Sequence, residues 1–210
     1  MSLQHRFWTS NTPAQGFWAY HVFKDVYSLR KLETNLQDVA FPTNPGDLNG
    51  HDPLSKVLGD GFEGFGEIFF RVFGPHPDIR VCQLQVSPEG QQGFDFTYKH
   101  TADYSNSTIQ AKYIGRGKAW EEELRESEKM RLERYLKASQ NEAMVPVDAT
   151  DNMIVFTNAK GIDYFTAETL LYDKVRPIAR KHIEYLTNNN RAFWDSARVM
   201  IMQTNPYIKF

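Results

Sequence analysis

Residues 93–98 read Gly-Phe-Asp-Phe-Thr-Tyr, and residues 109–113 read Ile-Gln-Ala-Lys-Tyr. Both stretches alternate apolar and polar side chains, a pattern that is typical of β-strands with one buried face. The turn-forming residues 103–106, Asp-Tyr-Ser-Asn, lie between them. The sequence therefore predicts two strands, over 93–100 and 107–114, that pair as an antiparallel hairpin at the centre of the fold.

Further secondary structure is predicted on both sides of this hairpin. Phenylalanines recur at helical spacing over 60–73, whereas 79–86 and 152–158 have the apolar residues of strands. With the charged segment 118–140 as a second helix, the order is helix, strand, strand, strand, helix, strand. This order predicts the α/β class, with a mixed sheet flanked by helices. The remaining elements are expected to be a strand over 174–179 and helices over 181–188 and 191–203.

Three regions are expected along the chain. Residues 54–160 contain the predicted core. Residues 1–53 form an N-terminal helical and loop extension, in which the apolar spacing from Gly16 to Asn35 predicts one amphipathic helix. Residues 161–210 form a C-terminal extension that packs on the core.

The composition bounds the class of protein. The chain has 210 residues, and 24 Lys and Arg against 26 Asp and Glu give a net charge of −2, which excludes a histone-like polycation. Cys82 is the single cysteine, so an internal disulfide framework and a cysteine-based zinc site are excluded. No apolar run approaches the roughly 20 residues of a membrane span, and no membrane partner is expected. We therefore expect a protein of the reducing cytoplasm.

One face of the predicted hairpin carries the residues that could support chemistry. Because side chains alternate along a strand, Asp95 on one strand and Gln110 and Lys112 on the other converge on that face. The Asp95 carboxylate and the Gln110 carbonyl are hard oxygen ligands suited to Mg²⁺, and the backbone carbonyl of Ala111 can add a third. A bound Mg²⁺ polarises a phosphate and lowers the pKa of a bound water. The face therefore predicts metal-assisted hydrolysis of a phosphodiester.

Charged groups near this face are expected to complete the site. Lys112 could orient the attacking water, act as its base, or stabilise the negative charge that develops on the phosphate. Glu63 and Glu67 lie four residues apart on the helix predicted before the sheet, so both face the same way. We expect Glu63 to serve the site and Glu67 to be a surface residue.

Three short stretches carry a resemblance to a known family. They are Gly61-Phe62-Glu63, Gly93-Phe94-Asp95 and Gln110-Ala111-Lys112. In this order they resemble the PD-(D/E)XK nuclease superfamily, and within it the Mrr-like restriction nucleases and the nuclease domains fused to some phage and bacterial helicases, which use a D-xn-QxK motif. The resemblance covers about residues 57–158, where 155–159 followed by Gly161 is similar to the strand and loop that close the core. Phe94 stands where the family name has proline, a departure that is common in this branch.

The resemblance implies a fold, an activity and a set of site residues. The fold would be a restriction-endonuclease-like core (α-β-β-β-α-β), and the substrate would be DNA. Asp95, Gln110 and Glu63 would bind the metal, Mg²⁺ or Mn²⁺ in its place, and Lys112 would be catalytic. The implied protein is a metal-dependent DNA endonuclease of restriction, homing or phage type. Because one active site cuts one strand, a double-strand cut implies a homodimer.

Basic residues near the predicted site indicate where DNA phosphates would bind. Lys99 lies in the first strand, and Arg116 and Lys118 follow the second. We expect all three to contact the DNA backbone. A second group of cations that could reach a phosphate lies further on, at Lys160, Lys174, Arg176, Arg180 and Lys181.

Other functions stay open at this point. A non-catalytic nuclease-fold protein could use the same core to bind DNA or a phage structural partner, and a nuclease of this kind could act on branched or single-stranded DNA during repair. The sequence has no Gly-x-Ser-x-Gly elbow, no phosphate-binding Gly-x4-Gly-Lys loop and no dinucleotide fingerprint. The six histidines show no spacing typical of metal ligands.

Overall fold

The computed structural model describes residues 2–9, 13–40, 53–88, 94–113, 152–159 and 175–210. The chain forms two compact units. We call Phe69–His182 the sheet unit, and Met1–Ile68 with Ile183–Phe210 the terminal unit. The boundaries expected at residues 53 and 160 stay a prediction.

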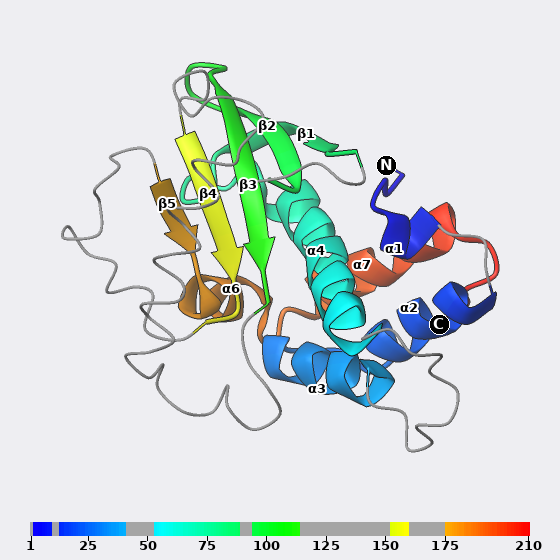
Figure 1. The fold of residues 1–210 in the computed structure, drawn as a ribbon. Coiled ribbons are helices and arrows are strands. Elements are labelled where there is room, and N and C mark those ends of the chain that lie inside the picture. Colours follow the sequence, from blue (N-terminus) through cyan, green and yellow to red (C-terminus); the bar gives the residue numbers. More distant parts are fainter. Residues whose placement is uncertain (1, 10–12, 41–52, 89–93, 114–151, 160–174) are drawn as a thin grey trace. The chain divides into compact units, whose positions relative to one another are not determined.

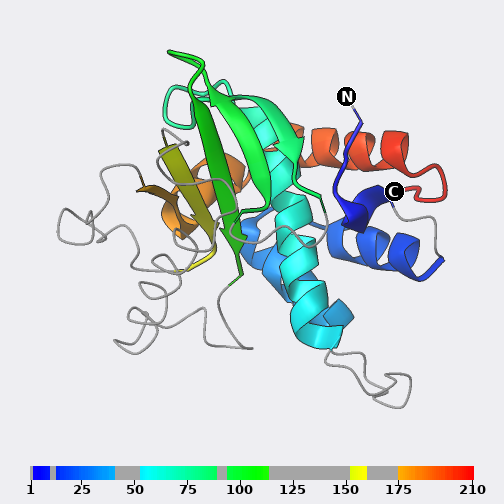
Figure 2. The ribbon, with the colours of Figure 1, turned by 45° about the horizontal axis from the view of Figure 1, so that its top comes forward.

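A five-stranded sheet forms the sheet unit (Figure 1). Its strands lie in the order β1-β2-β3-β4-β5, in which β1, β2 and β3 are antiparallel neighbours and β3, β4 and β5 are parallel neighbours. The predicted α/β class, the mixed sheet and the central antiparallel hairpin are therefore confirmed, and Figure 2 shows the same strands from a second direction. The bounds are β1 (Val81–Val86), β2 (Phe96–His100), β3 (Asn106–Lys112), β4 (Asn152–Thr157) and β5 (Val175–Ile178).

One face of this sheet is apolar, as the alternation predicts. Phe96 of β2, Ile109 of β3 and Phe156 of β4 have no exposed surface. Phe69 and Phe70, at the end of helix α4 (Pro53–Phe73), pack on this face, each with its ring centroid 5.1 Å from that of Phe156. Burial of these aromatic side chains is the main force that holds the end of the helix to the sheet, because burying each such side chain contributes roughly 1.5–3 kcal/mol.

The terminal unit is helical, with a core of aromatic residues. Phe65 of α4 stacks on Trp194, with ring centroids 5.9 Å apart and an interplanar angle of 13°. Trp8 and Phe23 meet edge to face in the same unit, at 5.2 Å. Besides part of α4, its helices are α1 (Arg6–Thr9), α2 (Pro13–Phe23), α3 (Leu29–Ala40), α7 (Arg191–Thr204) and the end of α6 (Arg180–Thr187).

The single helix predicted from Gly16 to Asn35 is wrong, because the chain breaks between α2 and α3. The Ser28 hydroxyl accepts a hydrogen bond from the backbone N–H of Lys31 at 3.2 Å, which caps the start of α3. The Arg198 guanidinium donates to the carbonyls of Phe23 at 3.1 Å and Val26 at 2.6 Å. These contacts provide donors for the last carbonyl of α2 and for one carbonyl of the turn that follows. Apolar spacing alone does not reveal the break, because it continues across the turn.

Two glycines of α4 allow other segments to approach the helix closely. A Cβ atom at Gly64 would lie 2.8 Å from the Trp8 ring, and one at Gly61 would overlap the Leu36 side chain. The Trp8 indole N–H donates to the Gly64 carbonyl at 3.1 Å. Glycine costs a helix about 1 kcal/mol relative to alanine, and here close packing offsets that cost.

The predicted helix over 118–140 lies outside the described residues. Within the described part of the chain, none of the helices is both long enough and apolar enough to cross a membrane.

Candidate metal site

Asp95 and Gln110 lie side by side on the β2–β3 pair. Phe96 pairs with Ile109, which places Asp95, the residue before β2, opposite Gln110. The Gln110 side-chain amide donates to Asp95 Oδ2 at 2.7 Å. The backbone N–H of Ala111 donates to the same oxygen at 2.6 Å. The structure therefore brings together the first two of the predicted ligands.

The local backbone explains why the Asp95 carboxylate takes this position. Asp95 N–H donates to the Ile109 carbonyl at 2.8 Å, and this bond continues the β2–β3 ladder. The next N–H of β3 that points toward β2 is that of Ala111, and it donates to the Asp95 side chain. The aspartate therefore satisfies a donor at the end of the strand and is held in a defined orientation.

The Gln110 amide lies between two oxygens. Its Nε2 is 2.7 Å from Asp95 Oδ2 and 3.3 Å from the backbone carbonyl oxygen of Ala111. Both oxygens point toward the amide N–H groups, which carry partial positive charge, and a bound cation would meet the same two oxygens. The Gln110 side chain is buried and Asp95 is half-buried, so their interaction is only partly screened by water.

The donor set of this site fits a hard cation. Rotation of the Gln110 amide by half a turn would exchange Nε2 for Oε1 and bring a third oxygen to those of Asp95 and Ala111. A carboxylate, an amide oxygen and a backbone carbonyl are ligands that Mg²⁺ accepts while it keeps several waters. Among the residues that the structure describes, no group of three His, Cys, Asp or Glu side chains could hold a metal. The β2–β3 pair itself would therefore offer a metal one carboxylate and two neutral oxygens.

Lys112 lies two residues after Gln110 in the same strand. Side chains alternate across a strand, so Lys112 and Gln110 share a face. The Lys112 backbone pairs with Thr157 of β4, and its side chain is half-buried. By alternation, the strand therefore places Lys112 on the face that holds Asp95 and Gln110, and its catalytic role stays a prediction.

Glu63 and Glu67 belong to the terminal unit, and both contact its N-terminal segment. The Glu63 carboxylate lies 3.1 Å from His5 Nε2. The His5 Nδ1 atom accepts from the Phe7 N–H at 3.2 Å, so it is Nε2 that carries the proton donated to Glu63. The part of Glu63 in metal binding stays a prediction.

The expectation that Glu67 is a surface residue is wrong. Its side chain has no exposed surface, and its carboxylate accepts from the backbone N–H groups of Gln4 at 2.7 Å and His5 at 2.9 Å. A buried carboxylate requires such partners. Four-residue spacing on a helix shows that two acids share a face, but it does not show which segment covers them.

One of the three expected DNA-binding residues lies within the described part of the chain. Lys99 shares the sheet face of Asp95 by alternation, about 13 Å away along β2 at the usual rise per residue. Its ammonium contacts Asn106 Oδ1 at 2.5 Å and lies at the exposed surface. Arg116 and Lys118 lie outside the described residues.

Two arginines of the second basic group bind main chain. Arg176 donates to the carbonyls of Asp78 and Ile79, and Arg180 donates to the Asn158 carbonyl at 2.9 Å. Arg180 is buried, and burial lowers the pKa of Arg176. We therefore assign both side chains to the internal structure of the sheet unit. Lys160 and Lys174 lie outside the described residues.

Comparison with known proteins gives no relative for the chain: no family model, no curated protein and no solved structure matches it.

Proposed function

We propose that this protein is a metal-dependent DNA endonuclease of restriction, homing or phage type that hydrolyses phosphodiester bonds. The observation that supports the proposal is the contact between Asp95 and Gln110, with the Ala111 carbonyl beside it. Asp95 and Gln110 lie at the end of the β2–β3 pair away from the turn that joins these strands, and the Gln110 amide contacts the oxygens of Asp95 and Ala111 there. By alternation along β3, Lys112 shares this face. Metal-assisted hydrolysis needs this combination of oxygen ligands and a cation.

Each residue has a defined part in the proposed reaction. Asp95, Gln110 and the Ala111 carbonyl would hold Mg²⁺, with Mn²⁺ as a substitute. Glu63 is the proposed second carboxylate. When bound, the metal would polarise the scissile phosphate and lower the pKa of a water. Lys112 would hold that water or stabilise the charge on the phosphate.

The DNA backbone would be bound by cations near the site. Lys99 lies on the face of Asp95, and Arg116 and Lys118 follow β3 in the sequence. Each phosphate contact adds affinity without reading the base sequence. A double-strand cut would require two active sites, and we propose that a homodimer supplies them.

Conversion of supercoiled plasmid to nicked or linear DNA tests this proposal. Cleavage is expected with Mg²⁺ or Mn²⁺ and not in excess EDTA. Ca²⁺ should support DNA binding without cleavage, because it accepts the same ligands but activates water poorly. Cleavage that continues unchanged in EDTA would refute the metal mechanism.

A second candidate is a nuclease-fold protein that binds DNA, or a phage structural partner, without cutting. The bonds that Asp95 accepts from Gln110 and Ala111 favour it, because they give the aspartate a structural role that needs no metal. A protein of this kind would bind DNA equally well with and without Mg²⁺ and would leave the plasmid intact.

A further inference from the structure

The surface of the terminal unit has two adjoining hollows that share Lys24 and Asp25. The larger, about 900 Å³, lies among the α2–α3 turn, the start of α7 and the C-terminal residues. The smaller, about 360 Å³, lies between α2 and α3. We call the two hollows together the groove, and none of its residues belongs to the candidate metal site.

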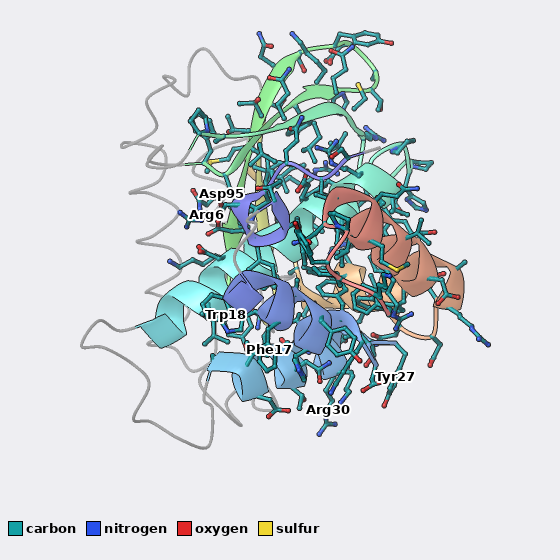
Figure 3. The ribbon with its side chains drawn as sticks, turned by 90° about the vertical axis from the view of Figure 1, so that its right-hand side faces the viewer. Arg6, Phe17, Trp18, Tyr27, Arg30 and Asp95 are labelled. Atoms are coloured by element: carbon teal, nitrogen blue, oxygen red, sulfur yellow. The ribbon has the colours of Figure 1, made fainter. Side chains whose placement is uncertain are left out.

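Aromatic rings stand exposed in this groove. Tyr27 of the larger hollow is 60% exposed and Phe17 of the smaller is 57% exposed, and Figure 3 labels both. Phe210 borders the larger hollow and is stacked on Tyr20, with ring centroids 5.7 Å apart. Large exposed rings gathered in one groove are typical of a binding surface.

The backbone around Tyr27 is held in place although its ring is exposed. The Tyr27 carbonyl accepts from the Asn189 N–H at 3.1 Å. The preceding carbonyl, of Val26, accepts from Arg198 at 2.6 Å, and the Leu29 N–H donates to Asn188 at 3.1 Å. Because the backbone of this turn is already fixed, stacking of a ligand on the Tyr27 ring costs little additional conformational entropy.

Cations stand beside these rings. Lys24 lines the groove from the turn after α2, Lys31 from α3, and Arg191, with a side chain 93% exposed, from α7. Asp195 is paired with Arg198 at 2.9 Å and with Arg191 at 3.6 Å, which reduces its charge toward a ligand. Asp25 and Asp38 also line the groove, so the positive surplus is small.

We propose that this groove binds single-stranded nucleic acid, with a base stacked on Tyr27 and a phosphate near Lys24. Aromatic rings interleaved with cations are the arrangement by which proteins hold single strands regardless of sequence. The choice of DNA as the ligand rests on the proposed function, to which the groove adds a second contact surface, on the terminal unit. Because the charge surplus is small, stacking contributes more of the affinity than charge does.

Fluorescence anisotropy of a short labelled oligothymidylate, measured in EDTA, tests the proposal without any cleavage. Loss of one stacking contact costs roughly 1–3 kcal/mol, so Tyr27→Ala should weaken binding about tenfold, whereas Tyr27→Phe should bind as the wild type does. Lys24→Ala should lower the dependence of log Kd on log salt by about 0.7, the value for one phosphate of a single strand. Tyr185→Ala is the matched control, since Tyr185 is 82% exposed in the same unit and lies outside the groove.

Several outcomes would overturn the proposal. They are equal affinity of the Tyr27→Ala and Tyr185→Ala proteins, no binding by the wild type, and full competition by unlabelled duplex at equal concentration. A Tyr27→Ala change that alters the sedimentation of the protein and not its DNA affinity would assign the groove to a second copy of the chain. Plasmid cleavage without Tyr27-dependent binding refutes only the proposal that the groove binds nucleic acid. Tyr27-dependent binding without cleavage refutes only the proposed nuclease activity.

Discussion

The Gln110 side-chain amide donates a 2.7 Å hydrogen bond to the Asp95 carboxylate across the β2–β3 pair. The amide therefore does for this carboxylate what a cation would do, since it presents positive charge to an otherwise acceptor-only group. A glutamine can serve in both states of such a site, with its nitrogen toward Asp95 when no metal is bound and its oxygen toward the metal when one is. Glutamate can serve only in the second state, which makes position 110 a sensitive test.

We expect Gln110→Glu to destabilise the protein in EDTA and to be rescued by a divalent cation. A glutamate there would place two carboxylates against each other at a buried position, at a cost of about 3 kcal/mol. The melting temperature should fall by roughly 10 °C. Excess Ca²⁺ should restore it, because an ion that binds only the folded state stabilises that state.

The control for this measurement is Gln85→Glu, which adds the same charge at an exposed position of β1. It should change the melting temperature little with or without Ca²⁺. If Ca²⁺ raises the melting temperature of the Gln110→Glu and Gln85→Glu proteins equally, residue 110 is not a metal ligand.

Lys112→Ala and Lys99→Ala are expected to affect different steps. An electrostatic contact made in the transition state is commonly worth about 3 kcal/mol, so Lys112→Ala should slow plasmid cleavage about a hundredfold with little loss of DNA affinity. Lys99→Ala should weaken binding and reduce its salt dependence by about one phosphate contact, at a nearly unchanged cleavage rate. Single-turnover cleavage beside gel shifts at fixed salt measures both. Parallel loss of binding and cleavage in the Lys112→Ala protein would contradict the catalytic role.

Gly64→Ala should destabilise the protein, whereas Gly59→Ala should not. At Gly64 a Cβ would lie 2.8 Å from the buried Trp8 ring, and overpacking of this kind costs about 2 kcal/mol. At Gly59 the nearest atom would be 4.0 Å away, so the gain in helix propensity, up to about 1 kcal/mol, is kept. Urea unfolding measures both free energies, and equal midpoints for the two variants would disprove the close approach of Trp8 to α4.

His21 should titrate below the ordinary histidine pKa. Burial is the larger cause and the Lys24 ammonium the smaller, and both lower the pKa from 6.5 because they disfavour the protonated ring. The folded-state pKa lies below the unfolded one, so the contribution of His21 to stability is present above pH 6.5 and is lost as the pH falls through the folded-state pKa.

NMR titration of the His21 ring protons measures this directly. Lys24→Met should raise the pKa of His21 without restoring its ordinary value, because burial remains. Lys31→Met, at another lysine of the same hollow, is the control and should leave the pKa close to that of the wild type. A His21 pKa that is insensitive to Lys24 would contradict the placement of these two side chains.

The sheet and much of its site could be predicted from the sequence, because both depend on alternation within short segments. A strand with one buried face places every second side chain on the same side, so Phe96 and Ile109 identify the apolar face, and Asp95 and Gln110 then fall on the other. The pairing of Asp95 with Gln110 follows once the register of the hairpin is known.

Features that depend on contacts between distant segments could not be predicted in this way. The break between α2 and α3 relies on Arg198, which is more than 170 residues from Phe23 in sequence. Burial of Glu67 depends on the N-terminal segment that lies against α4. The orientation of the Gln110 amide, with nitrogen and not oxygen toward Asp95, is set by local hydrogen bonds that residue types alone leave undecided.

The hydrogen bonds from Arg198 to the α2–α3 turn have a consequence for how the sequence of this protein can vary through evolution. The guanidinium binds main-chain carbonyls, which every amino acid offers, and no side chain of residues 23–26 takes part in these bonds. Substitutions at the exposed positions of that turn, Lys24, Asp25 and Tyr27, can therefore accumulate without loss of the anchor, and ring size or charge there can change to suit a new ligand. Position 198 has no such freedom, since lysine lacks the two-pronged planar group that reaches both carbonyls. Descendants of this chain should thus diverge in the turn while they retain one arginine far away in sequence.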